Sequence, residues 1–298
     1  MRRFLLLILL MAGLCSCATG RYGRGPESRD IEALPGFDGI IEAVNYPSSE
    51  KQLTERRMVV YLPKDYYRDT LKRYPVMYLF HGARGNEKTW IDSADVFHRL
   101  DSLRAGGLAK DFILVMPNMN RYYSDKEYNN GHCLRAMQAF WLQDGEAERH
   151  FLHDVVQFTD RRYRTVAAKS GRAIAGMSNG GLQALYLSAD HPNSFDYVGL
   201  FSPYAQATFA AKYHRDVYKG LSWKLEEQFA NPPKEYIIYI GKADFFYPHM
   251  RAYDRRLTRH GYPHTFVQAA GGHEWYNWID FYVDFCQKIF RESDADGS

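Results

Sequence analysis

The sequence predicts an α/β domain with a mostly parallel central sheet that carries helices on both faces. Short apolar runs alternate with longer amphipathic stretches along most of the 298 residues, which is the pattern of strands and helices in such a domain. The apolar runs contain almost no polar alternation, as expected for strands that are buried on both faces. No internal repeat or low-complexity block interrupts residues 39–290. A single domain is therefore expected there.

The individual elements follow from the runs and from their boundaries. Pro63, Pro75 and Pro117 bound three of the apolar runs, consistent with the inability of proline to pair inside a sheet. Strands are predicted at residues 58–62, 76–80, 112–116, 173–177, 197–201, 236–240 and 265–268. Helices are predicted at residues 96–104, 149–161, 181–189, 251–260 and 278–290.

Composition excludes several classes of protein. The chain has 38 Lys and Arg against 35 Asp and Glu, a net charge of +3, and no long basic run. A nucleic-acid partner is not expected, because neutralising phosphates needs a concentrated basic surface. The chain has 4 cysteines, too few for a disulfide framework at this length. Whether Cys133 and Cys286 form a disulfide stays open at this point.

The beginning of the chain predicts export. Arg2 and Arg3 precede an apolar run over residues 4–14, which is the order of a secretory signal and is too short to span a membrane. The run ends in Leu14-Cys15-Ser16-Cys17, which resembles the bacterial lipobox with Cys17 as the lipidated residue. Cys15 departs from the small residue usual at its position, so ordinary cleavage nearby is the alternative.

These features predict an exported lipoprotein anchored to a membrane, on the periplasmic side or at the cell surface. The expected division is a signal peptide over residues 1–16, a lipid-anchored tether over 17–37, the domain over 38–291 and a disordered tail over 292–298.

The sharpest chemical motif is Gly176-Met177-Ser178-Asn179-Gly180-Gly181, because it lies between a predicted strand and a predicted helix. In this context a Gly-x-Ser-x-Gly motif forms a nucleophile elbow, a tight turn that exposes the serine hydroxyl. Glycine on both sides allows the neighbouring backbone to approach closely. Ser178 is therefore the candidate nucleophile.

A serine nucleophile needs a histidine base and a carboxylate that orients it. His273 lies in a glycine-rich loop after the last predicted strand, whereas His249, His260 and His264 lie in less suitable positions. Asp244 directly follows the buried run at residues 236–240, at the sheet edge where such sites form. Asp254 is expected on a solvated helix face, and Glu274 is too close to His273 in sequence to orient its ring.

The loop His81-Gly82-Ala83-Arg84-Gly85 follows the strand at residues 76–80. Its small residues leave backbone N–H groups available for a developing oxyanion. The N–H groups of Ala83 and of Asn179, the residue after the nucleophile, are the predicted oxyanion hole.

Together these stretches resemble the esterase family of α/β-hydrolases, the group that includes esterase D and carbohydrate esterase family 1. The matching motifs are residues 57–63, 74–82 and 115–118, the elbow followed by His191-Pro192, residues 241–244, and Gly272-His273-Glu274-Trp275. The resemblance implies the α/β-hydrolase fold and a Ser178, His273 and Asp244 triad, with no metal or cofactor.

The resemblance leaves the substrate open. The leader, the His273-Glu274-Trp275-Tyr276-Asn277-Trp278 pattern and the aromatic residues near the site favour feruloyl or related acyl esters of plant cell-wall, xylan-type polysaccharide. The candidate substrate-binding residues are Trp141, Tyr204, Phe245, Trp275 and Trp278. Alternatives are a siderophore esterase that cleaves catechol triesters, an acetyl-xylan esterase, and, outside the enzymes, a non-catalytic carbohydrate-binding scaffold.

One further cluster contains residue types that can bind a metal ion. His150, His153 and Asp154 share a predicted helix face, but no third well-placed ligand accompanies the histidines. We therefore predict no metal there.

Overall fold

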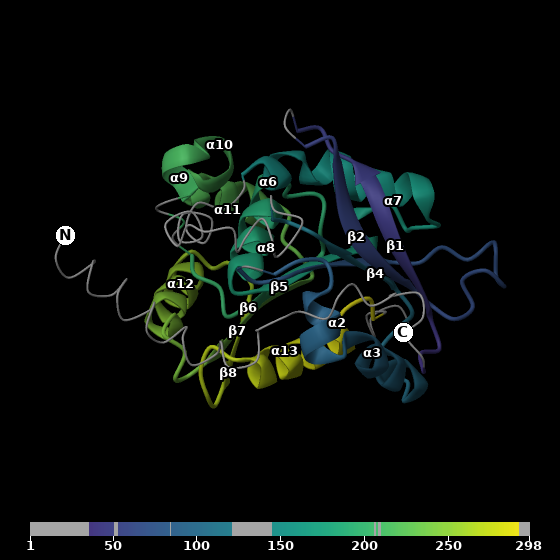
Figure 1. Ribbon diagram of the computed structural model, residues 1–298. Helices are drawn as coiled ribbons and strands as arrows, with labels where there is room; N and C mark the ends of the chain where they lie inside the picture. Colours follow the sequence, from purple (N-terminus) through teal and green to yellow (C-terminus); the bar gives the residue numbers. More distant parts are fainter. Residues whose placement is uncertain are drawn as a thin grey trace, which may run out of the picture. The chain divides into compact units, whose positions relative to one another are not determined.

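The central sheet has eight strands in the order β1-β2-β4-β3-β5-β6-β7-β8 (Figure 1). The computed structural model describes residues 36–50, 53–83, 85–120, 145–205, 207 and 210–291. Strand β2 pairs antiparallel with β1 and with β4, and the other pairings in the sheet are parallel. This is the mostly parallel sheet of an α/β-hydrolase fold, as predicted.

The strands match the apolar runs closely. Their bounds are β1 Ile40–Pro47, β2 Glu55–Leu62, β3 Val76–Phe80, β4 Ile113–Pro117, β5 Arg172–Met177, β6 Tyr197–Phe201, β7 Glu235–Gly241 and β8 Thr265–Ala269. The prediction missed β1, whose residues alternate between half-buried, exposed and buried positions. An edge strand of this kind has no continuous apolar run, so its position depends on pairing with β2.

The helices connect these strands. Their bounds are α2 Thr89–Ala94, α3 Val96–Ala105, α6 Glu146–Phe151, α7 Gln157–Arg162, α8 Asn179–Asp190, α9 Ala210–Tyr213, α10 Arg215–Tyr218, α11 Leu221–Ala230, α12 Tyr247–Arg259 and α13 Trp275–Lys288. A π-helical turn, η2 Leu152–Val156, joins α6 to α7, and a short 3-10 turn, η3 Lys169–Gly171, precedes β5. The predicted helix at 149–161 is thus three segments, and α2, α9, α10 and α11 were not predicted.

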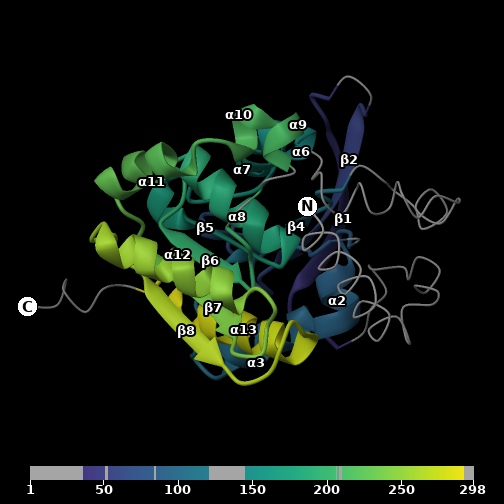
Figure 2. The same ribbon diagram turned by 90° about the vertical axis from the view of Figure 1, so that its left-hand side faces the viewer.

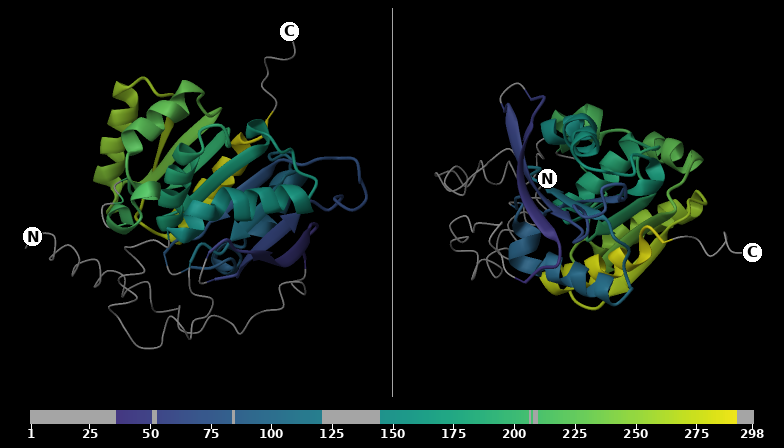
Figure 3. Two further views of the ribbon diagram at one scale, coloured as in Figure 1. Left: turned by 90° about the horizontal axis from the view of Figure 1, so that it is seen from above. Right: turned by 90° about the vertical axis from the view of Figure 1, so that its right-hand side faces the viewer.

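The helices form a layer on each face of the sheet. Helices α6, α8, α11 and α12 pack on one face, and α2, α3 and α13 cover the other (Figures 2 and 3). Within the described ranges, no helix combines the length and the apolar character that crossing a membrane requires. Cys286 on α13 is a buried free thiol, and burial raises its pKa to about 12. Cys133 and Cys17 lie outside the described residues.

Phe285 fixes α13 to the sheet. Its side chain is fully buried and meets the ring of Phe201 on β6 at 5.9 Å between centroids. A Cβ atom added at Gly199 would come within 3.0 Å of the Phe285 ring, so that ring lies directly on the backbone of β6. Glycine at this position lets the helix approach the sheet.

Replacing Phe285 with alanine leaves a cavity between α13 and β6. We expect F285A to lower the free energy of unfolding by about 3–5 kcal/mol, as measured by urea denaturation. The exposed Asp280 on the same helix provides the matched control, since D280A should change stability by no more than about 0.5 kcal/mol. Equal stability of F285A and D280A would contradict this role.

Candidate active site

Ser178 lies on a strained turn between β5 and α8. Its φ is 55° and its ψ is −117°, a conformation that side-chain-bearing residues rarely adopt and that costs about 1–3 kcal/mol. The turn depends on glycine: a Cβ atom at Gly176 would lie 2.5 Å from the carbonyl carbon of Gly180, and one at Gly180 would lie 2.4 Å from the carbonyl oxygen of His81. This geometry puts Ser178 at the carboxyl-terminal edge of the parallel strands.

The structure brings the side chains of Ser178, His273 and Asp244 together. His273 Nε2 is 2.9 Å from Ser178 Oγ, and His273 Nδ1 is 2.8 Å from Asp244 Oδ2. The Asp244 side chain is 0% exposed and that of His273 is 14% exposed. The second carboxylate oxygen, Asp244 Oδ1, accepts the backbone N–H of Phe246 at 2.8 Å. Both oxygens of the carboxylate are therefore used, which fixes its orientation.

The loops that carry Asp244 and His273 are joined by their backbones. The N–H of Ala243 donates to the carbonyl oxygen of Gly271 at 2.8 Å. A Cβ atom at Gly241 would lie 2.4 Å from that same oxygen, so glycine at the end of β7 permits the contact. Glu274 Oε1 accepts the N–H of Gly272 at 2.6 Å. The glutamate thus shapes the histidine loop, and Asp244 is the carboxylate on the His273 ring.

The other histidines considered as the base contact residues outside the Ser178, His273 and Asp244 series. His264 Nε2 is 3.2 Å from Asp254 Oδ1, and the ring of His260 stacks on Tyr262. His249 lies on α12 beside the ring of Phe246. Among the contacts of the described residues, Ser178 and Asp244 form no hydrogen bond with His249, His260 or His264.

Aromatic rings surround the His273 imidazole. The ring of Phe245 lies 4.5 Å from it and is 45% exposed, whereas Trp278 meets it edge-on at 4.9 Å and is 8% exposed. Trp275 is half-buried between Trp90 and Trp278. The accessible aromatic surface beside the histidine is thus mainly that of Phe245, and the tryptophans pack behind it.

Two predicted substrate-binding residues remain, Tyr204 and Trp141. The hydroxyl of Tyr204 donates to Asn179 Oδ1 at 3.1 Å, and its ring lies 5.0 Å from that of Phe246. Tyr204 is therefore adjacent to the elbow. Trp141 lies outside the described residues.

The predicted oxyanion loop passes over the serine. A Cβ atom at Gly82 would lie 3.6 Å from Ser178 Cβ, and Ala83 follows directly in the chain. Asn179 is the first residue of α8, and the first N–H groups of a helix point out of its amino-terminal end. Both predicted donors thus belong to segments that converge at the serine.

His81 holds this loop, a role that the sequence did not reveal. The side chain is buried, and its Nε2 accepts the N–H of Met119 at 3.0 Å. Since that nitrogen is an acceptor, Nδ1 carries the proton and donates to the carbonyl oxygen of Gly82 at 2.8 Å. Burial lowers the pKa of His81 to about 4, so the ring is neutral near pH 7.

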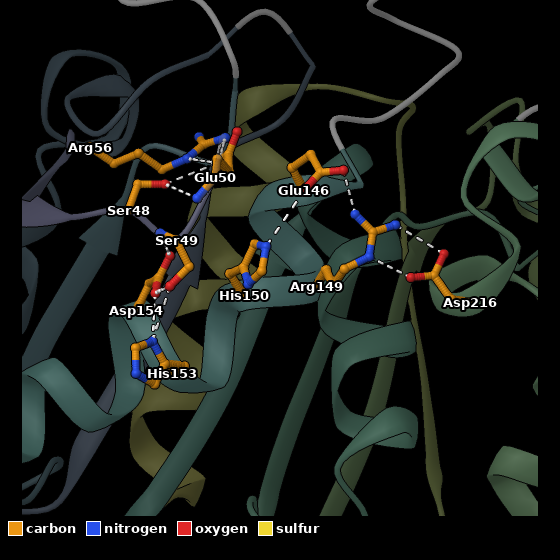
Figure 4. Close-up of polar contacts among 10 residues, drawn as sticks. All are labelled: Ser48, Ser49, Glu50, Arg56, Glu146, Arg149, His150, His153, Asp154 and Asp216. Atoms are coloured by element: carbon orange, nitrogen blue, oxygen red, sulfur yellow. Dashed lines mark hydrogen bonds and ion pairs between the residues drawn. The ribbon is translucent and has the colours of Figure 1, made fainter. Parts of the chain in front are cut away.

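A buried ion pair supports the oxyanion loop through the segment that follows β4. Arg56 pairs with Glu50, and both side chains are almost fully buried (Figure 4). Arg56 Nη1 also donates to the carbonyl oxygens of Asn118 and Asn120. Asn120 Nδ2 in turn donates to the carbonyl oxygen of Gly85 at 2.6 Å. The segment after β4 therefore connects this ion pair to the oxyanion loop.

The histidines of the predicted 149–161 helix contact neighbouring carboxylates. His153 Nδ1 is 2.8 Å from Asp154 Oδ1, and His150 Nε2 is 3.6 Å from Glu146 Oε2 (Figure 4). In the described ranges, no group of three or more His, Cys, Asp or Glu side chains has an arrangement that could hold a metal ion.

The fold and the arrangement of Ser178, His273 and Asp244 at the ends of its strands place the chain among the α/β-hydrolases. A model of the family described as "Putative esterase" matches residues 49–283. The chain belongs to this family, as its motifs predicted.

Several curated proteins are similar in sequence. An endo-1,4-beta-xylanase/feruloyl esterase of Xylanibacter ruminicola is 32% identical over 146 residues, which cover 48% of this chain and 19% of that protein. Endo-1,4-beta-xylanase Y of Acetivibrio thermocellus is 25% identical over 78% of this chain and 22% of that protein. The chain thus matches only about a fifth of the length of these two relatives. An acetyl esterase of Caldicellulosiruptor saccharolyticus is 21% identical over 78% of this chain and 88% of that protein.

Solved structures agree on the fold. A CE1 ferulic acid esterase from the anaerobic fungus Anaeromyces mucronatus superposes with a TM-score of 0.69 at 22% identity, covering 91% of this chain and 95% of that chain. An S-formylglutathione hydrolase from Staphylococcus aureus superposes with a TM-score of 0.66 at 17% identity, covering 85% and 97%.

The neutral state of His81 makes its contribution to stability dependent on pH. Below pH 6.5 an unfolded histidine binds a proton, but folded His81 stays neutral down to a pKa of about 4. Its stabilising contribution is therefore complete above pH 6.5 and falls by about 3 kcal/mol as the pH drops to 4. We expect the difference in unfolding free energy between wild type and H81N to shrink across this interval.

Urea denaturation of both proteins at several pH values measures this difference directly. Comparing them removes the contributions of other titrating groups, which are common to both. A difference that stays constant from pH 7 to pH 4 would show that His81 is not held neutral.

Proposed function

We propose that the protein is a serine esterase with Ser178 as its nucleophile. The observation that carries the proposal is the continuous hydrogen-bonded series from Ser178 Oγ through His273 to the buried Asp244 carboxylate. A serine on a strained turn, a histidine in contact with it and a carboxylate on the far ring nitrogen meet the geometric requirements for acyl transfer. Membership of the esterase family supports this chemistry.

In this mechanism, Ser178 Oγ attacks the ester carbonyl while His273 Nε2 takes its proton. The N–H groups of Ala83 and Asn179 stabilise the negative charge on the carbonyl oxygen. His273 then protonates the leaving alcohol, and the carbon–oxygen bond of the ester breaks. Water, deprotonated by His273, attacks the acyl-enzyme, and Ser178 recovers its proton as the acid is released. Asp244 holds the histidine tautomer and stabilises its cationic form throughout.

For the substrate, we propose feruloyl or related acyl esters on xylan-type polysaccharide. Support comes from a relative named as a xylanase/feruloyl esterase and from the fold shared with ferulic acid esterases. At the site, Phe245 and Tyr204 put aromatic surface next to His273 and Asn179. A phenolic ring can stack on such surfaces.

The second candidate is the hydrolysis of acetyl esters. It is favoured by the acetyl esterase that aligns with this chain over 88% of its own length. An acetyl group fills far less space than a feruloyl group, so the two candidates differ in how much of the aromatic surface the substrate contacts. Two further alternatives are an esterase for catechol siderophore triesters and a scaffold that binds carbohydrate without catalysis. The same assay distinguishes both from a feruloyl esterase.

The deciding experiment compares wild type with S178A on methyl ferulate, an aryl acetate, acetylated xylan and a catechol siderophore. We expect wild type to cleave methyl ferulate and S178A to lose roughly 10⁴-fold or more of that activity, because alanine has no hydroxyl with which to form the acyl-enzyme. The exposed Ser170, at the opposite end of β5 from the elbow, offers a matched control, and S170A should retain full activity.

Each other result has a defined meaning. Cleavage of acetates alone would keep the nucleophile and replace the feruloyl assignment. Activity retained in a folded S178A, shown by unchanged circular dichroism, would remove the nucleophile assignment. No cleavage of any ester by wild type would favour the carbohydrate-binding scaffold.

We also propose that the protein is exported and anchored through a lipid on Cys17. The support is the Leu14-Cys15-Ser16-Cys17 motif after a short apolar run. We expect the full-length chain to fractionate with membranes and C17S to become soluble, as measured by blotting membrane and soluble fractions. The C15S variant is the control and should stay with the membrane. Unchanged membrane association of C17S would overturn the anchor.

A further inference from the structure

A hollow of about 450 Å³ lies at the corner between α10 and α11, away from the candidate active site. It is lined by Arg215, Asp216, Lys219, Gly220 and Trp223. The neighbouring residue Lys224 pairs with Asp190, the last residue of α8, whereas Ser178 precedes the first residue of that helix. Among the contacts of the described residues, none joins the five lining residues to Ser178, Asp244 or His273.

The walls of the hollow are held in place. The buried ammonium of Lys224 donates to the carbonyl oxygen of Val217 at 2.6 Å and to that of Asp216 at 3.1 Å, so α11 is attached to α10. Arg149 on α6 binds both carboxylate oxygens of Asp216, at 2.5 Å and 3.0 Å (Figure 4). The hollow is therefore fixed by contacts from three helices.

Trp223 forms an open aromatic surface in this hollow. Its side chain is 54% exposed. A Cβ atom at Gly220 would lie 1.9 Å from Trp223 Nε1, so the indole rests on the glycine backbone, whose φ is +77°. The Lys224 ammonium lies 5.6 Å from the indole centroid. The indole is thus both positioned and accessible, an arrangement suited to stacking with a flat ligand.

Two cationic side chains, Arg215 and Lys219, line the hollow beside the indole, whereas the exposed Glu226 and Glu227 lie one turn further along α11. Arg215 and Lys219 lie four residues apart and are both exposed. In the described part of the chain, no acidic side chain pairs with either of them, whereas Asp216 pairs with Arg149, which also pairs with Glu146. The hollow therefore combines an apolar face with unpaired cations, which suits a ligand that has both a flat apolar side and a carboxylate.

We propose that this hollow binds a uronic-acid-bearing segment of the polysaccharide. The apolar face of a pyranose ring would stack on Trp223, and the uronate carboxylate would pair with Arg215 and Lys219. The choice of a xylan-type polymer rests on the proposed function. The binding site itself does not depend on catalysis, because the hollow is separate from Ser178.

The experiment measures binding of deacylated glucuronoxylan, which carries no ester to cleave, by isothermal titration calorimetry. A matched polymer whose carboxyl groups have been reduced tests the charge requirement. We expect W223A to bind glucuronoxylan about tenfold more weakly, equivalent to roughly 1.4 kcal/mol. The R215Q/K219Q double variant should bind both polymers equally, because it retains the indole and lacks the cations.

Exposed aromatic and cationic residues outside the hollow provide the control variants. Tyr67 is 58% exposed and Lys64 and Lys110 are exposed, so Y67A and K64Q/K110Q should bind like wild type. Hydrolysis of methyl ferulate should be unchanged in W223A. Binding by W223A within about twofold of wild type, or equal binding of the reduced polymer by wild type, would overturn the proposal. Failure of wild type to cleave methyl ferulate would instead contradict the proposed function. The binding assay would still test the hollow, because its polymer carries no ester.

Discussion

The close contact between the turn at Ser178 and the loop after β3 is the constraint on which the site depends. Gly180 lies so near the carbonyl oxygens of Phe80 and His81 that a side chain there has no space. This contact brings the start of α8 and the predicted oxyanion loop to the same point. The strain at Ser178 persists because the surrounding strands hold both ends of the turn, as expected for strained residues at functional sites.

The rest of the site is built from segments far apart in the chain. Ser178 and His273 are 95 residues apart, and His273 and Asp244 are 29 apart. Parallel strands bring them together, because the carboxyl ends of β5, β7 and β8 lie along one sheet edge. The backbone hydrogen bond between Ala243 and Gly271 then sets the separation of the acid and histidine loops. Catalytic geometry of this kind requires positioning to within fractions of an ångström.

Three buried polar side chains, His81, Arg56 and Glu50, support the oxyanion loop. His81 is kept neutral by burial and bridges Gly82 and Met119, and Arg56 with Glu50 holds the segment after β4. Buried charges and unpaired polar atoms are costly unless they are fully hydrogen-bonded. Their cost is offset here by a network that fixes the loop on which Ala83, one of the two proposed oxyanion donors, lies.

The sequence by itself determined the alternation of strands and helices, the fold class, and Ser178 on its glycine-flanked turn, because periodicity and glycine sterics act over a few neighbouring residues. It also indicated Asp244, which follows a buried strand, and His273, which lies in the glycine-rich loop after the last strand. Only the tertiary structure decided the pairing of edge strand β1, the burial of Trp278 against the exposure of Phe245, and the roles of His81 and Arg56. These features depend on contacts between distant segments, because elements tens of residues away set the burial and hydrogen bonding of a residue. Local sequence patterns therefore do not predict them.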